Sequence, residues 1–315
     1  MPEKVTNMTI ITEFLLMGFP DIMLLQRLYA TLFFIIYLAA VMGNLLIIIL
    51  TTIDQKFQVP MYFFLKNLSL IDICYISVTV PKSIMNSLTN SHSISFQGCA
   101  LQVFLVMCFA GTEFALLIVM SYDRYAAICH PLHYEAIVHR GACVQMVTAS
   151  WLSGCVYGSI HVAGTFSVRF CGPKIVHQFF CDIPSLLTLS CYEDHILEYT
   201  FIIASCCFAF ICFILMVVSY VHIFSTVLRI PSAQGRIRTF STCMPHLTVV
   251  TLFLSSGFFA YLGSTSKSSS YLNIFMSVLY SLLPPTLNPV IYSLINRNMK
   301  VAFVKMFGGI MAPKM

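Results

Sequence analysis

The chain has 315 residues, of which 58% are hydrophobic and only 9% charged, and its formal net charge is +5. A soluble globular protein is about half apolar and about one quarter charged, so this composition excludes a soluble domain and indicates a membrane protein. The small positive charge is explained better by basic residues gathered on one side of a membrane than by nucleic-acid binding.

The first 27 residues are interpreted as a tail on the outer side of the membrane. They lack the basic start, apolar run and cleavage site of a signal peptide, so the first span is expected to act as an uncleaved signal anchor. Asn7 begins the glycosylation acceptor Asn-Met-Thr, which an outside tail makes accessible. The other match, at Asn67, falls inside a predicted span and is interpreted as chance.

Seven stretches are long enough to cross a hydrocarbon core about 30 Å thick, which takes roughly 20 helical residues. Their apolar runs are continuous, which favours helices over barrel strands with their two-residue alternation. The predicted spans are Leu28–Leu50, Met61–Lys82, Cys99–Ile128, Cys143–Ala163, Leu197–Leu228, Arg238–Leu262 and Tyr271–Leu294.

Lys and Arg are concentrated in the segments that share a side with the C-terminus, which predicts an extracellular N-terminus and a cytoplasmic C-terminus. The expected fold is all-α, a seven-transmembrane helix bundle with a short amphipathic C-terminal helix. It forms one domain, with an extracellular tail at 1–27, the bundle at 28–294 and a cytoplasmic tail at 295–315.

Polar side chains lie inside four of the predicted spans: Asn44 in the first, Asp72 in the second, Glu113 in the third and Asn288 in the seventh. Ionisable groups in a membrane helix are costly and usually functional. If the four converge, they suit a Na⁺ ion or a proton shared by the acids near Asp72 and Glu113. The alternative is a hydrogen-bonded network that only holds the helices together.

The seventh span contains Pro285 and Pro289, which interrupt its backbone hydrogen bonds and free carbonyl groups for side chains or water. A bent helix with polar groups can rearrange, although kinks also occur in static bundles.

Asp123 and Arg124 lie near the cytoplasmic end of the third span. An adjacent ion pair neutralises itself in one state and releases its arginine in another, as a two-state switch requires. The alternative is an arginine that extends to the lipid headgroups.

Four of the thirteen cysteines are expected on the oxidising side: Cys99, Cys171, Cys181 and Cys191. They allow three pairings. We predict Cys99–Cys181 and Cys171–Cys191, with Cys99–Cys191 as an alternative. The loop that carries the last three is too long for a simple connector, so it is interpreted as a lid over a binding site.

Seven strings in order resemble the rhodopsin-like G-protein-coupled receptors, and among them the olfactory (odorant) receptors, over nearly the whole chain. They are GN at 43–44, PMYFFL at 60–65, MSYDRYAAICHPLHY at 120–134, HQFFCD at 177–182, SY at 219–220, RTFSTCMPH at 238–246 and LNPVIYSL at 287–294.

The resemblance implies that Asp123, Arg124 and Tyr125 couple to a heterotrimeric G protein, and that Tyr220 and Tyr292 move inward on activation. The implied partner is the stimulatory olfactory G protein, which raises cyclic AMP. The same resemblance assigns Asn44, Asp72, Glu113, Asn288 and Pro289 to a central polar network.

The resemblance also places a ligand site in the outer half of the bundle, and the third span offers no acid there for an amine. A small, neutral, largely apolar volatile is therefore the expected ligand. No cofactor is expected, and no metal is expected apart from the possible Na⁺ near Asp72 and Glu113. The candidate contacts are Val106, Met107, Ala110, Gly111, Ala204, Ser205, Phe208, Phe258, Tyr261 and Val278.

The sequence departs from the family pattern at Leu254 and Ser255, where an aromatic residue is usual, and at Ile295, where arginine is usual. These departures bear on coupling efficiency.

Three other classes compete with an odorant receptor. A transporter would show an internal repeat, and none is seen. An enzyme with a histidine metal site would show a close pair of histidines, and His246 is interpreted as a helix-packing residue. A receptor of the same fold for a non-odorant small molecule stays open.

Overall fold

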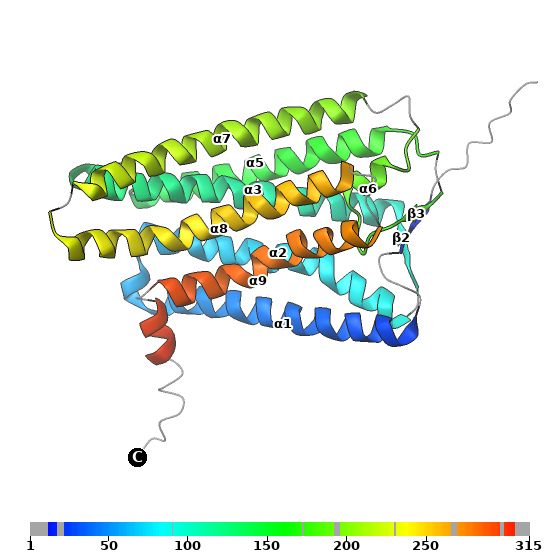
Figure 1. The fold of residues 1–315 in the computed structure, drawn as a ribbon, viewed down its shortest axis with the longest axis horizontal. Coiled ribbons are helices and arrows are strands. Elements are labelled where there is room, and N and C mark those ends of the chain that lie inside the picture. Colours follow the sequence, from blue (N-terminus) through cyan, green and yellow to red (C-terminus); the bar gives the residue numbers. More distant parts are fainter. Residues whose placement is uncertain are drawn as a thin grey trace, which may run out of the picture.

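The computed structural model describes residues 12–17, 22–89, 91–171, 173–191, 196–229, 231–265, 270–296 and 299–305. Within these residues, seven long helices lie side by side in one bundle (Figure 1). They are α1 (Met23–Ile53), α2 (Pro60–Thr89), α3 (Phe96–Cys129), α5 (Arg140–Ser167), α7 (Ile196–Leu228), α8 (Ala233–Thr265) and α9 (Ser270–Ile295). The predicted helix bundle is confirmed.

Each long helix contains one predicted span, and all but α7 extend beyond it at both ends. The extension is largest at the end of α2, which continues to Thr89 and does not stop at Lys82. Five of the seven, all but α5 and α8, carry a continuous stretch apolar enough to cross a membrane, counted over the described residues. The hydropathy of a span sets only the part that lies in lipid, because helical hydrogen bonds continue into water.

Small residues bring α3 and α5 into close contact. A β-carbon on Gly154 would collide with the side chain of Thr112 and the carbonyl of Cys108, and one on Gly158 would lie 2.8 Å from the carbonyl oxygen of Phe104. Glycines four residues apart share one helix face, so α5 presents a flat strip to α3. Close packing on α3 thus holds a helix that lacks the continuous apolar stretch found in α3 and α7.

Large apolar side chains cover the outside of the bundle. Examples are Leu28 and Ile35 on α1 and Phe210, Ile211 and Leu215 on α7, which are 58–63% exposed. An exposed apolar surface of this extent is stable against lipid and not against water. The chain is therefore a multi-pass membrane protein.

A small sheet lies at one end of the bundle, here called the outer end. Strand β1 (Glu13–Leu16) pairs antiparallel with β2 (Ser93–Ser95) and parallel with β3 (Ile175–Val176), giving the order β2-β1-β3. The N-terminal segment is thus hydrogen-bonded to two loops, a pairing that was not predicted from the sequence. Phe14 is fully buried beneath it.

The opposite, inner end carries short helices: η1 (Gln55–Phe57), η2 (Pro131–His133) and α4 (Tyr134–Ile137). A helical segment at 299–305 also lies there, turned away from the axis of α9 (Figure 1). Its Met299 is buried, whereas Val304 is 65% exposed. The expected short C-terminal helix is present.

Candidate functional site

The lid over the outer end is held by both predicted disulfides. Cys99 at the start of α3 is bonded to Cys181, with Cα atoms 5.6 Å apart, and Cys171 is bonded to Cys191, with Cα atoms 5.2 Å apart. The Cys181 N–H donates to Oε1 of Gln102 on α3 at 2.9 Å, which fixes the lid a second time. The predicted pairing is confirmed.

An acidic residue joins the lid to α9. Asp182 precedes the short helix α6 (Ile183–Leu187), and its Oδ1 accepts a 2.8 Å hydrogen bond from the hydroxyl of Tyr280. Burial raises the pKa of Asp182 from 3.8 to about 6, and the hydrogen bond from Tyr280 opposes part of that rise. The lid is therefore attached to a helix whose inner half carries other polar groups.

Two aromatic residues of the lid reach into the bundle. Phe179 and Phe180 are at most 3% exposed, and the ring of Phe179 lies 5.5 Å from that of Phe33 on α1. They pack in one apolar cluster with four of the predicted ligand contacts. These four are Val106, Met107, Ala110 and Val278. We call this group of lid and helix residues the outer cluster.

The other predicted ligand contacts are not part of the outer cluster. Gly111 faces α5, because a β-carbon there would lie 3.0 Å from Cδ1 of Tyr157. The hydroxyl of Ser205 is hydrogen-bonded to Nε2 of His161 on α5 at 3.2 Å. Ala204 is exposed and Phe208 is 64% exposed, on the face that meets lipid.

Several predicted residues lie outside what the structure describes. The side chains of Phe258, Tyr261 and Ile295 are outside the described part of the structure, and so is the whole of Asn7. Of the two departures in α8, Leu254 packs against the cluster of the inner half, and the Ser255 hydroxyl donates to the carbonyl of Leu252 at 3.1 Å.

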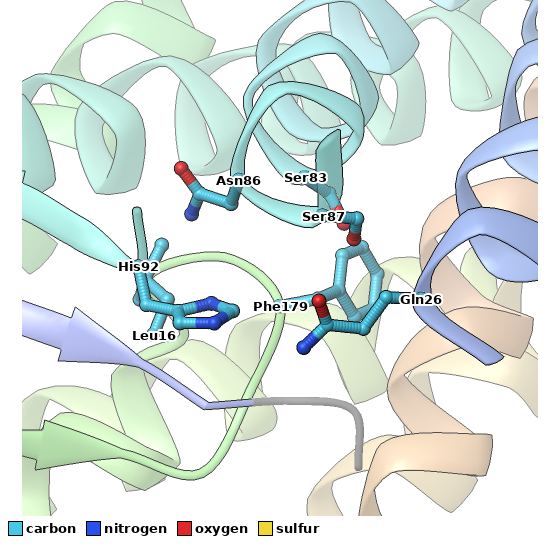
Figure 2. Close-up of a pocket in the computed structure, with 7 residues that line it drawn as sticks. All are labelled: Leu16, Gln26, Ser83, Asn86, Ser87, His92 and Phe179. Carbon is cyan, nitrogen blue, oxygen red and sulfur yellow. The ribbon is translucent and has the colours of Figure 1, made fainter. Parts of the chain in front are cut away.

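A small polar pocket opens beside the lid, between the ends of α1 and α2 (Figure 2). None of the predicted ligand contacts lines it.

In the middle of the bundle, Asn288 joins two acids from different helices. Its Nδ2 lies 3.0 Å and 3.2 Å from the carboxylate oxygens of Asp72 on α2 and 3.3 Å from Oε1 of Glu113 on α3. All three side chains are at most 2% exposed. Three of the predicted network residues therefore meet as expected.

Asn44 has a different partner from the one expected. Its Nδ2 donates to the carbonyl of Pro285 at 2.9 Å and to that of Ala40 at 3.0 Å. The Pro285 carbonyl lacks its helical donor because residue 289, four positions later, is a proline without an N–H. The amide of α1 thus supplies the hydrogen bond that Pro289 removes, and Gly43 lets the helices approach, since a β-carbon there would lie 3.1 Å from the Pro289 ring.

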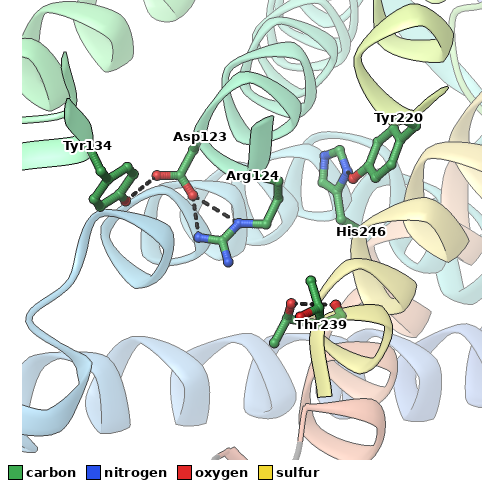
Figure 3. Close-up of polar contacts among 7 residues, drawn as sticks. Asp123, Arg124, Tyr134, Tyr220, Thr239 and His246 are labelled. Carbon is green, nitrogen blue, oxygen red and sulfur yellow. Dashed lines mark hydrogen bonds and ion pairs between the residues drawn. The ribbon is translucent and has the colours of Figure 1, made fainter. Parts of the chain in front are cut away.

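At the inner end of α3, Arg124 is paired with Asp123 (Figure 3). Nε of Arg124 lies 3.0 Å from Oδ2 of Asp123, and one terminal nitrogen contacts the same oxygen. The hydroxyl of Tyr134 donates to Oδ1 at 2.6 Å, so both carboxylate oxygens are used. Asp123 is 1% exposed, and the Arg124 side chain is turned toward it and away from Tyr220.

A histidine links three helices beside this pair. His246 on α8 has Nε2 3.0 Å from the carbonyl oxygen of Leu117 on α3 and Nδ1 2.5 Å from the hydroxyl of Tyr220 on α7. Because a carbonyl can only accept, Nε2 carries the hydrogen and Nδ1 accepts from Tyr220. His246, predicted from the sequence to be a helix-packing residue, therefore also joins α3, α7 and α8 by hydrogen bonds.

Two predicted tyrosines of the switch have different surroundings. Tyr125 packs against the apolar cluster that contains Tyr220 and Ile223 of α7, and its hydroxyl lies 3.1 Å from Nε2 of His130. Tyr292 is buried in the inner half, and its hydroxyl has no hydrogen-bond partner among the described residues.

The comparisons with known proteins agree with this architecture. The model of the olfactory receptor family matches residues 33–309. Human olfactory receptor 14A16 is 54% identical over 98% of this chain and 99% of its own length, and human olfactory receptor 14L1 is 55% identical over 96% and 93%. Gorilla olfactory receptor 1G1 is 43% identical over 95% of this chain and 96% of its own.

These matches span the bundle, its lid and its inner end, and the family they define is not enzymatic. The chain belongs to the olfactory receptor family, within the rhodopsin-like G-protein-coupled receptors.

Proposed function

We propose that this receptor binds a small, neutral, largely apolar volatile in the outer half of the bundle. The observation that carries the proposal is the outer cluster, in which Val106, Met107, Ala110 and Val278 face the lid residues Phe179 and Phe180. The buried acid of the lid, Asp182, already accepts a hydrogen bond from Tyr280. Apolar burial therefore dominates binding there.

The size of a volatile sets the expected affinity. Burial of roughly 200 Å² of apolar surface contributes about 5 kcal/mol at about 25 cal/mol per Å². This corresponds to sub-millimolar dissociation constants, and one or two polar contacts orient the ligand. Tyr261 remains our candidate for such a contact.

On the inner side, the proposed partner is the stimulatory olfactory G protein, which raises cyclic AMP. Arg124 supports this assignment because a hydrogen-bond acceptor of a bound protein can replace Asp123 as the partner of its guanidinium group. The proposed orientation places the N-terminus outside the cell and the C-terminus in the cytoplasm.

The test is a cyclic AMP assay of the full chain, expressed with trafficking factors, against a panel of volatiles. We expect Met107→Ala to shift agonist potency, and Arg124→Ala to abolish the response while agonist binding persists. The matched control is Met42→Ala, since Met42 is 57% exposed on α1. Unchanged potency of every agonist in Met107→Ala and Tyr261→Phe would place the ligand elsewhere, and an intact response in Arg124→Ala would remove the coupling assignment.

We also propose that the Asp72, Glu113 and Asn288 group takes a Na⁺ ion in the resting state. Two carboxylates share a single amide donor there, and Oδ1 of Asn288 has no hydrogen-bond partner among the described residues. Oxygen ligands suit a hard cation. Replacement of Na⁺ by N-methylglucamine should raise agonist potency in the native receptor and leave agonist potency in the Asp72→Asn variant unchanged. Equal potency of the native receptor in both salts would contradict the proposal.

A further inference from the structure

The polar pocket at the outer end lies apart from the proposed odorant site. Gln26 comes from α1, Ser83, Asn86 and Ser87 from α2, His92 from the segment before β2, Leu16 from β1 and Phe179 from the lid (Figure 2). The pocket holds about 260 Å³ of empty space with its open mouth included. Its enclosed part has about the size of one water molecule.

Two nitrogen atoms at this pocket are buried without a partner. Nε2 of Gln26 and Nε2 of His92 have no hydrogen-bond partner among the described residues, and Gln26 is only 4% exposed. Both side chains extend into the pocket from opposite sides (Figure 2). Nε2 of Gln26 is an amide donor, and Nε2 of His92 is a donor in the tautomer that carries its hydrogen there. A buried donor without an acceptor is costly, so with this tautomer the pair forms a site for an acceptor from outside.

Among the described residues, the rest of the lining consists of three polar side chains and the apolar Leu16 and Phe179. Ser83 and Asn86 are at most 5% exposed, and the lining includes no Asp or Glu. Gln26 lies in the first turn of α1, where no acidic residue is present and Ile22 at the N-cap cannot accept a hydrogen bond. Helix starts carry a partial positive charge, which favours an electron-rich oxygen.

We propose that this pocket is an accessory site for the carboxylate or carbonyl oxygen of a small organic molecule. Gln26 and His92 donate to that oxygen, and the rest of the molecule occupies the open mouth. A metal ion does not fit, because His92 is the sole strong metal ligand of the lining and the described residues hold no cluster of three His, Cys, Asp or Glu.

Phe179 connects this site with the outer cluster. It lines the polar pocket, and the same side chain packs against Phe33 and belongs to the cluster that contains Val106. A bound acceptor therefore lies against a side chain that also borders the proposed odorant site.

The test measures binding directly, without an odorant or a G protein. The purified full-length receptor in lipid nanodiscs is mixed with ¹³C-labelled acetate and, separately, ¹³C-labelled acetone, and line broadening of each probe is recorded by NMR. We expect broadening of acetate by the native receptor and at least a tenfold loss of affinity in the double variant Gln26→Leu/His92→Leu. Thr31→Ala, an exposed position on α1, is the matched control and should bind like the native chain.

A second variant separates loss of the site from loss of the fold. Gln26→Glu keeps the volume of the side chain but adds a negative charge, so acetate binding should fall much more than acetone binding. Equal broadening in the native chain and the double variant, or none in the native chain, would overturn the proposal and leave water as the occupant. Neither outcome affects the odorant assignment, which the cyclic AMP assay tests separately.

Discussion

The hydroxyl of Tyr134 lies 2.6 Å from Oδ1 of Asp123, so a residue of the loop after α3 shares the carboxylate that pairs with Arg124. This contact makes the ion pair part of a three-residue group that joins α3 to α4. Burial and the neighbouring Asp123 carboxylate raise the pKa of Tyr134, which keeps the phenol protonated and able to donate.

Loss of that donor should weaken the resting state. In Tyr134→Phe, Asp123 loses a hydrogen bond to a charged group, a contribution of about 1.5–3 kcal/mol. Some of this difference should appear as an increase in basal G-protein activation of several fold, measured without agonist at matched surface expression. Tyr122→Phe is the control, because Tyr122 is 44% exposed. Unchanged or lower basal activity in Tyr134→Phe would show that the contact does not restrain Arg124.

The bond between Asn44 and the Pro285 carbonyl predicts a rescue. Asn44→Leu leaves that buried carbonyl without a donor, which should lower stability by about 1–3 kcal/mol. Pro289→Ala restores an N–H at the position four residues after Pro285, so the double variant should lose less stability than the sum of the two single variants. Thermal unfolding of the solubilised receptor measures the difference. Simple additivity would mean that the two donors do not serve the same carbonyl.

The lid predicts a pH dependence. The pKa of Asp182 is raised to about 6, above its ordinary 3.8, so the folded chain binds more protons than the unfolded chain between these values. Stability from this group should therefore fall as pH rises from about 4 to about 6, by about 3 kcal/mol at most.

Asp182→Asn should remove this dependence and make the receptor more stable than the native chain at pH 7.5, as measured by thermal unfolding at several pH values. Tyr280→Phe removes the hydrogen bond that lowers the pKa, so its transition should shift to higher pH. A native unfolding profile that is already flat between pH 4 and 6 would exclude this role of Asp182.

The contact of α3 with α5 predicts strict size limits. Gly154→Ala should reduce surface expression and thermal stability, because the added carbon collides with Thr112 and the Cys108 carbonyl, and such overpacking costs about 1–3 kcal/mol. Gly257→Ala is the matched control, since no atom lies within 4 Å of a β-carbon built there. In a helix that change is neutral or favourable by up to about 1 kcal/mol. Comparable loss in both variants would point to helix propensity or trafficking and not to the contact.

The sequence by itself determined the number and position of the long helices, whereas it left three pairings of the outer cysteines open and the structure decided between them. Helix position follows from local hydropathy, because a span must match the thickness of the hydrocarbon core. The meeting of Asp72, Glu113 and Asn288 was also predictable, since buried ionisable groups in lipid need one another.

Only the tertiary structure decided which face of each helix looks inward. Lipid is as apolar as the interior, so a run such as that of α7 carries little information on its rotation, and Phe208 is found on the exposed face. The rotation is set by close contacts between helices, such as the Gly154 strip and the Gly43 contact with Pro289. The Gly43 contact brings Asn44 within reach of the Pro285 carbonyl, and the packing of α8 against α3 and α7 places His246 between Leu117 and Tyr220. Strand pairing between distant segments joins β1 to the lid.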